Sequence, residues 1–278
     1  SLLAVPRRTA LLGAYTATTI VAGFGALAFA TAMLLVSPDA GLRSDIAIGG
    51  LDGFVSGAAG VAVWILYALA GGTRMLRDPG GHATLTFHLP FIAAATILGG
   101  PIAGAWVAAL GTVDLRELRE APWYGVLANH ASLILAAFAG GLVFEGAVGL
   151  AGAVGIGSNL VVLLVGGLAG TAVLAIVSAL LAAGVVVLRD GLEPSDTLTL
   201  MNHSFRRTAV AETILGWVFV VVWVAAGWWA PALLTVVVLT LWRASADAEA
   251  LDHDALTGVL SRGAFAQRAA EAADRARR

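Results

Sequence analysis

The sequence predicts an all-α protein, a polytopic bundle of transmembrane helices. Of its 278 residues, 59% are hydrophobic and only 12% are charged, whereas a soluble domain carries about 25% charged residues. Long apolar runs recur along the chain, and a membrane-spanning helix needs about 20 such residues. The 34 glycines fit this class, because small residues let helix backbones approach closely within a membrane. With no cysteine, the sequence predicts neither a disulfide framework nor a thiolate metal site.

Five apolar runs are long enough to span a membrane without interruption. In chain order they are Ala10–Val36, Ile46–Ala70, Trp123–Phe144, Asn159–Leu188 and Thr208–Ala226. The first run is too long for the hydrophobic region of a cleavable signal peptide, so we interpret it as a span.

Three further segments are shorter. Ala83–Leu98 and Ile102–Thr112 are separated by Gly99-Gly100-Pro101, and Trp228–Trp242 follows Gly227. Because Gly-Pro stops a helix and turns the chain, we expect the first two to form a tight helical hairpin. Its second arm is short enough to be tilted or re-entrant, which is tolerated where protein covers the backbone. The total is about eight membrane segments.

The arginines predict the orientation of these segments. With the N-terminus in the cytoplasm, the outer loops contain only Arg43. The cytoplasmic loops contain ten arginines: Arg7, Arg8, Arg74, Arg77, Arg116, Arg119, Arg189, Arg206, Arg207 and Arg243. Cytoplasmic loops of membrane proteins are enriched in basic residues. We therefore expect both termini in the cytoplasm and a hairpin that returns to the cytoplasmic side.

The composition changes after Arg243, which divides the chain into three parts. Residues 1–243 form the expected transmembrane bundle. Residues 244–253 are polar and alanine-rich and predict a cytoplasmic signalling helix that continues from the last span. Residues 254–278 start a separate soluble piece, which is too short to bury a core of its own.

This last part resembles the opening motif of GGDEF domains, D-x-L-T-G-L-x-N-R-x-x-F. Residues 254–265 read D-A-L-T-G-V-L-S-R-G-A-F. The sequence departs from the motif at Val259 and at Ser261, and Ser261 keeps a small polar residue that can cap the following helix. The match holds at six positions: Asp254, Leu256, Thr257, Gly258, Arg262 and Phe265.

The resemblance implies a diguanylate cyclase in the bacterial cytoplasmic membrane. Members of that family make cyclic di-GMP from two GTP molecules held by two facing domains, so a homodimer is expected. The family's catalytic, metal-binding and GG[DE]EF residues lie downstream of the motif. We therefore expect no enzyme activity, no metal site and no cofactor in residues 1–278, and GTP and Mg²⁺ in the missing part of the domain.

The membrane region carries a weaker resemblance to multi-helix sensors of the LytS and MASE types. It rests on Leu98-Gly99-Gly100-Pro101-Ile102-Ala103-Gly104 and on Ala139-Gly140-Gly141-Leu142-Val143-Phe144. The vitamin-binding S-components of ECF transporters have a similar pattern. The resemblance implies a ligand-sensing or ligand-binding bundle.

Polar residues within spans are candidate ligand-binding residues, because a charged side chain at mid-bilayer costs at least about 2.5 kcal/mol. Asp52 lies in a glycine-rich stretch, where close helix packing predicts a small buried pocket near the outer surface. Alternatively, Asp52 is hydrated at the interface or pairs with Arg43. A second group is predicted near the cytoplasmic side: His82, His88, Asn129, His130, Asn202, His203 and Glu212.

Three interpretations of this second group remain open. The side chains line a ligand cavity, bind haem or a metal, or satisfy loop backbone near the interface. Histidine is the commonest metal ligand, but the histidines come from different segments and lack a metal-binding spacing, so we predict no metal site.

The sequence as a whole predicts a membrane-embedded sensory and transducing module that controls cyclic di-GMP synthesis through a dimeric helical linker. The expected partners are the lipid bilayer, a second copy of the chain and a small-molecule or lipid ligand, with no nucleic acid. The alternative is a transporter-like or vitamin-binding membrane protein, similar to an ECF S-component, fused to a regulatory output.

Overall fold

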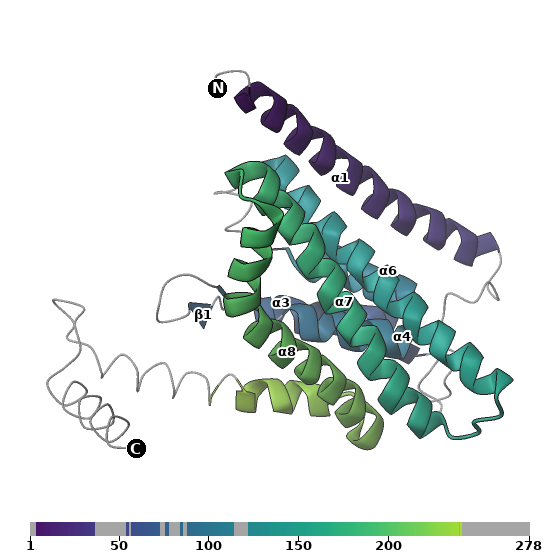
Figure 1. The fold of residues 1–278 in the computed structure, drawn as a ribbon. Helices are drawn as coiled ribbons and strands as arrows, with labels where there is room; N and C mark the ends of the chain where they lie inside the picture. The colour runs from purple at the N-terminus through teal and green to yellow at the C-terminus, as the bar shows by residue number, and fades with distance from the viewer. Residues whose placement is uncertain are drawn as a thin grey trace, which may run out of the picture. The chain divides into compact units, whose positions relative to one another are not determined.

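The protein is a bundle of helices (Figure 1). The computed structural model describes residues 4–36, 54–55, 57–72, 76–77, 84–85, 88–113, 122–238 and 240. Strand β1 (Leu76–Arg77) pairs with β2 (Thr84–Leu85). The described helices are α1 (Ala4–Val36), α3 (Ala58–Gly72), α4 (His88–Leu110), α6 (Trp123–Ala153), α7 (Asn159–Asp190) and α8 (Pro194–Ala226).

The chain divides into two compact units. These six helices belong to the first unit, formed by residues 1–76 and 85–227. The second unit comprises residues 77–84 and 228–278, and residues 230–238 within it are helical.

Four described helices are long and apolar enough to cross a membrane: Arg8–Val36, His88–Leu110, Trp123–Ala153 and Asn159–Asp190. Large apolar side chains point away from the protein along three of them, for example Phe29 on α1, Leu150 on α6 and Val165 on α7. Exposed apolar surface of this extent is costly in water and favourable in lipid. The fold is therefore all-α and has the character of a membrane protein.

Helix α4 meets this length only when two arms are counted together, because the chain reverses at Gly100. Gly100 has φ 83° and ψ 175°, a left-handed backbone region that glycine adopts without steric cost. A Cβ atom placed on Gly104 would lie 2.8 Å from the Cα atom of Thr96. Residues eight apart in a straight helix are about 12 Å apart along its axis. Residues 88–99 and 101–110 are therefore the two arms of a helical hairpin.

The hairpin is the core of the bundle. Its arms of 12 and 10 residues extend only about 18 and 15 Å, or about half the 30 Å hydrocarbon thickness. Helices α1, α3, α6, α7 and α8 all contact it. From Pro90 to Ala109, every residue except Trp106 is buried. The hairpin is thus an element whose arms are too short to cross a membrane singly, and it is shielded on almost all sides by protein.

Small residues allow the surrounding helices to approach the hairpin. A Cβ atom on Gly141 of α6 would lie 2.6 Å from the Cα atom of Pro101, and one on Gly216 of α8 would lie 2.9 Å from the Cβ atom of Ala93. Gly170 of α7 faces Ile97 in the same way. Such contacts between small residues are the usual means of helix association in membranes.

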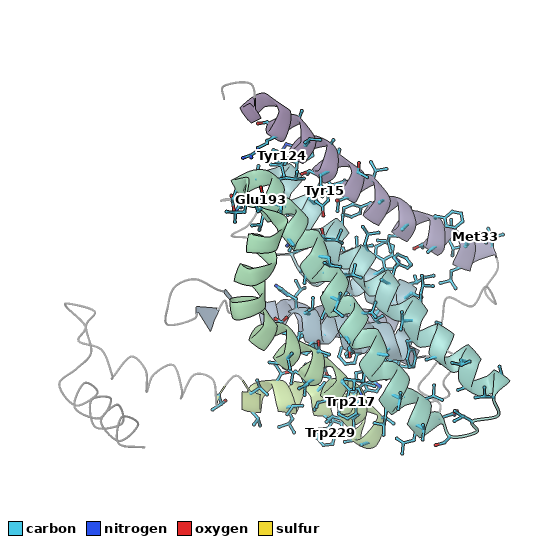
Figure 2. The ribbon with its side chains drawn as sticks, viewed as in Figure 1. Tyr15, Met33, Tyr124, Glu193, Trp217 and Trp229 are labelled. Carbon is cyan, nitrogen blue, oxygen red and sulfur yellow. The ribbon has the colours of Figure 1, made fainter. Side chains whose placement is uncertain are left out.

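Aromatic stacking attaches α8 to α3 and to the first arm of the hairpin. The rings of Trp64 and Trp223 are stacked with centroids 4.6 Å apart, and those of Phe91 and Phe219 with centroids 4.8 Å apart. Trp217, labelled in Figure 2, donates its indole N–H to the carbonyl oxygen of Leu164 on α7 at 3.0 Å. Helix α8 therefore packs on α3 and the first arm through its aromatic rings and is hydrogen-bonded to α7 through Trp217.

Helices α1 and α7 pack with their arginine-bearing ends together. Tyr15 of α1 (labelled in Figure 2) donates its hydroxyl to the carbonyl oxygen of Leu181 on α7 at 2.9 Å. The Arg8 guanidinium lies against Gly191, which ends α7 in the left-handed conformation with φ 69°. A cation is favourable at a helix C-terminus, where carbonyl groups lack helical partners.

Three described helices have bounds that differ from those of the predicted spans. The span expected at Ile46–Ala70 is interrupted, because α3 begins only at Ala58 and Gly57 donates its N–H to Phe54. Helix α6 continues past Phe144 to Ala153. Helix α8 starts at Pro194, well before Thr208, because Pro at the first helical position is favourable and a polar first half does not prevent helix formation. The eight expected spans therefore remain a prediction.

The hairpin geometry predicts that Gly104→Ala destabilises the protein by about 1–3 kcal/mol, because the added methyl group overlaps Thr96 in a packed core. Thermal unfolding in nanodiscs measures the effect. The matched control is Gly149→Ala on α6, where a Cβ atom meets nothing within 4 Å and alanine favours the helix. Equal unfolding temperatures for the two variants would contradict the hairpin packing.

Candidate ligand site

The structure describes only part of the predicted site. Asp52, His82 and the six motif residues Asp254, Leu256, Thr257, Gly258, Arg262 and Phe265 lie outside the described residues. Asn202 and His203 lie on α8, but their side chains lie outside the described part. His88, Asn129, His130 and Glu212 are described.

His88 joins the start of the hairpin to the end of α3. Its Nδ1 atom lies 3.2 Å from the carbonyl oxygen of Ala68, in the last turns of α3. The imidazole occupies the space beside Gly72, where any side chain would overlap the ring. The first arm therefore starts at a fixed position against α3.

His130 joins the end of the hairpin to α6. The side chain is only 5% exposed. Its Nδ1 atom lies 2.9 Å from the carbonyl oxygen of Ala109 and 3.1 Å from the hydroxyl oxygen of Thr112. Thr112 donates its hydroxyl to the carbonyl oxygen of Ala108 at 2.7 Å. Carbonyl groups at a helix C-terminus lack intrahelical partners. At the end of the second arm, the side chains of His130 and Thr112 act as hydrogen-bond partners for such carbonyl groups.

The two histidines occupy the same end of the hairpin. A Cβ atom on Gly111, at the end of the second arm, would lie 2.6 Å from the Cβ atom of Ala68, whose carbonyl group His88 contacts. The end of α3 and both ends of the hairpin therefore lie side by side. We call this layer, formed by Ala68, His88, Gly111, Thr112 and His130, the hairpin base.

Asn129 and Glu212 differ in their surroundings. Asn129 is exposed on α6, because adjacent helical residues point about 100° apart and its neighbour His130 faces inward. Glu212 is 8% exposed and lies one turn before Gly216, which packs on the first arm. Glu212 has no hydrogen bond or ion pair with any residue that the structure describes. Of these two, only Glu212 faces the interior.

A metal site is not formed by these groups within the described residues, where no three His, Asp or Glu side chains come together. Both histidines instead contact backbone carbonyl groups through Nδ1. That geometry holds hairpin ends in place and suits a structural contact better than direct coordination of a ligand.

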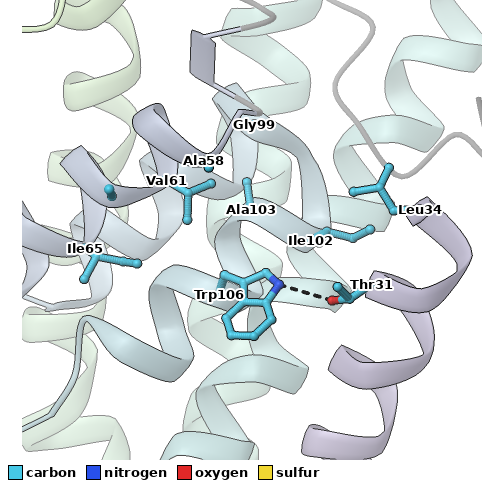
Figure 3. Close-up of a pocket in the computed structure, with 10 residues that line it drawn as sticks. Thr31, Leu34, Ala58, Val61, Ile65, Gly99, Ile102, Ala103 and Trp106 are labelled. Carbon is cyan, nitrogen blue, oxygen red and sulfur yellow. Dashed lines mark hydrogen bonds between the residues drawn. The ribbon is translucent and has the colours of Figure 1, made fainter. Parts of the chain in front are cut away.

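A pocket of about 300 Å³ lies near the hairpin tip (Figure 3). It is bounded by the last turns of α1, the first turns of α3, and the hairpin from Gly99 to Trp106. Trp106 donates its indole N–H across this space to the hydroxyl oxygen of Thr31 on α1 at 3.1 Å. Six of the lining residues are Thr31, Leu34, Ala62, Ile65, Ile102 and Trp106.

The sequence reasoning missed these lining residues. Thr31 and Trp106 lie within apolar runs, where a threonine or a tryptophan is an ordinary residue of a span. A usable signal was the tryptophan itself, because its N–H needs an acceptor and tryptophan otherwise favours the membrane interface. Trp106 instead lies midway along a short predicted arm.

No family model, curated protein or solved structure matches this chain.

The contacts of His130 predict that His130→Ala destabilises the protein by about 1–3 kcal/mol, the cost of leaving a buried carbonyl group without a partner. Thermal unfolding in nanodiscs measures the loss. Asn129→Ala, one residue away on the exposed face, is the control and should change stability by less than about 0.5 kcal/mol. An unchanged unfolding temperature for His130→Ala would show that the hairpin base does not depend on this side chain.

Proposed function

We propose that this chain is the membrane-embedded sensory and transducing module of a diguanylate cyclase. The observation that carries the proposal is the D-A-L-T-G-V-L-S-R-G-A-F stretch at residues 254–265, which follows the last apolar segment and resembles the start of a GGDEF domain. The module itself holds no catalytic residue of that family. Its role is to control cyclic di-GMP synthesis by the domain that the motif begins.

The packing of the hairpin supports a route for the signal. A ligand in the pocket contacts the second arm near the tip, where Ile102 and Trp106 form part of the wall. The first arm stacks on α8 through Phe91 and Phe219. A displacement of the hairpin is therefore passed to α8, and α8 precedes the segment that leads to the GGDEF motif.

The output requires two facing GGDEF domains, so the working unit is a homodimer. The linker at residues 244–253 changes the relation between the two domains when the bundle moves. Such a change is a shift between two populations of the dimer, and the ligand contributes only through its different affinity for the two. The arginine distribution supports a cytoplasmic C-terminus, on the side where GTP is available.

A chimera tests the proposal. The chain is extended after its GGDEF motif by the remainder of an active GGDEF domain, and cyclic di-GMP is measured in membranes at equal protein level. We expect Ala62→Phe, which fills the pocket, to change the cyclic di-GMP level several-fold, because it mimics or blocks occupation. Ala59→Phe on the same helix adds the same volume at an exposed position outside the pocket and should leave the level unchanged.

A second chimera distinguishes sensing from anchoring. It replaces the bundle with an unrelated dimeric transmembrane helix and keeps the linker and the output domain. If this replacement and the Ala62→Phe and Ala59→Phe variants all give the same cyclic di-GMP level as the unaltered chimera, the bundle is only an anchor and the proposal is wrong.

The re-entrant hairpin favours a second candidate, a transporter-like or vitamin-binding protein fused to a regulatory output. Membrane proteins place irregular backbone within the bilayer where it lines a cavity or is covered by protein. This candidate predicts a tightly bound polar molecule near the outer surface, at Asp52. Native mass spectrometry of the gently purified protein should then detect a bound molecule that Asp52→Asn releases. A spectrum that is identical for the two proteins would rule it out.

A further inference from the structure

The pocket is a place where the buried hairpin borders a cavity. All hairpin residues from Pro90 to Ala109 are buried except Trp106, and Trp106 lines the pocket. The opposite wall is formed by α1 and α3, with Thr31, Leu34 and Ala62. A molecule in this space contacts three separate segments of the bundle at once.

The described walls of the pocket favour uncharged, apolar ligands. The described residues that line it include no charged side chain. The Trp106 indole N–H is bonded to the Thr31 hydroxyl oxygen at 3.1 Å, and the Thr31 hydroxyl donates to the carbonyl oxygen of Leu27 at 2.7 Å. Both donors are therefore in use, and burying a polar ligand group without a partner costs roughly 2–7 kcal/mol.

The helices around the pocket indicate the phase from which a ligand arrives. The pocket begins at the tip, at Gly99, and extends along the second arm to Trp106. Helix α1, which forms one wall, is apolar enough to cross a membrane and exposes Phe29 and Leu35 beside the pocket residues Thr31 and Leu34. Exposed apolar surface of this kind favours lipid over water, so we infer that a ligand reaches the pocket from the bilayer.

The volume limits the size of the ligand. A cavity of about 300 Å³ equals the liquid volume of about ten water molecules. It is at the lower end of the range for ligand pockets, about 300–1,000 Å³. An unbranched hydrocarbon of about ten carbons fills such a space, whereas a fused-ring molecule of drug size exceeds it.

We propose that this pocket binds one uncharged hydrocarbon segment of about ten carbons, which enters from the bilayer and packs against Trp106. The segment belongs either to the acyl chain of a bilayer lipid or to a free apolar molecule dissolved in the membrane. This inference rests on the proposed function in that it names the class of ligand that the module senses. The binding itself is independent of any output domain.

Quenching of Trp106 fluorescence tests the proposal, since bromine quenches tryptophan only at short range. The Trp106 signal is obtained as the difference between the full chain and its Trp106→Phe variant in nanodiscs. One sample contains phosphatidylcholine brominated at mid-chain, and a second sample contains dibromodecane in unbrominated lipid. We expect at least half of the Trp106 signal to be quenched in one of these two samples. The sample that responds identifies the source of the hydrocarbon.

Pocket-filling variants separate binding from simple exposure to lipid. Ala62→Phe and Ala58→Phe both fill the pocket from α3, and each should reduce the quenching of Trp106 at least twofold. Ala59→Phe should leave it unchanged. Absence of Trp106 quenching in both samples overturns the proposal. Equal quenching in the pocket-filling variants and in the unaltered protein overturns it as well. Because no cyclic di-GMP is measured, that result leaves the sensory role itself standing.

Discussion

The constraint on which this fold depends is the need of every backbone polar group for a partner inside a membrane. The chain reverses at Gly100, within the apolar part of the sequence, and a reversal leaves N–H and carbonyl groups without helical partners. Lipid cannot satisfy them. The long helices therefore surround the hairpin, and glycines such as Gly141 and Gly216 allow them to approach its backbone.

The hairpin base follows from the same constraint. The base is the layer where the first arm begins and the second arm ends, and one histidine lies at each of these two points. His88 contacts the end of α3, and His130 contacts the end of the second arm. The sequence predicted both histidines as members of a larger polar group on the cytoplasmic side, and that side of the membrane remains a prediction. Their role as partners of backbone carbonyl groups required the three-dimensional contacts.

The sequence predicted the fold best where local chemistry decides it. Gly99-Gly100-Pro101 indicated the reversal, because glycine and proline restrict the backbone in known ways. Ser158 accepts a hydrogen bond from the N–H of Val161, and α7 starts at Asn159 as predicted. The extension of α6 was missed because its glycines favour a loop by propensity, while packing and the membrane favour a helix. The break before Ala58 depends on the approach of Phe54 to Gly60, a contact that no local pattern reveals.

The short arms of the hairpin also constrain how the protein is made. A segment of 12 or 10 residues is too short to remain across a membrane alone, and its turn is too polar to be left in lipid. When α4 leaves the ribosome, α6, α7 and α8 have not yet emerged, although they supply most of its cover. The hairpin must therefore wait in a protected environment, such as the insertion machinery, until those helices arrive. Assembly of the core is thus a late step of biogenesis, set by the order of segments along the chain.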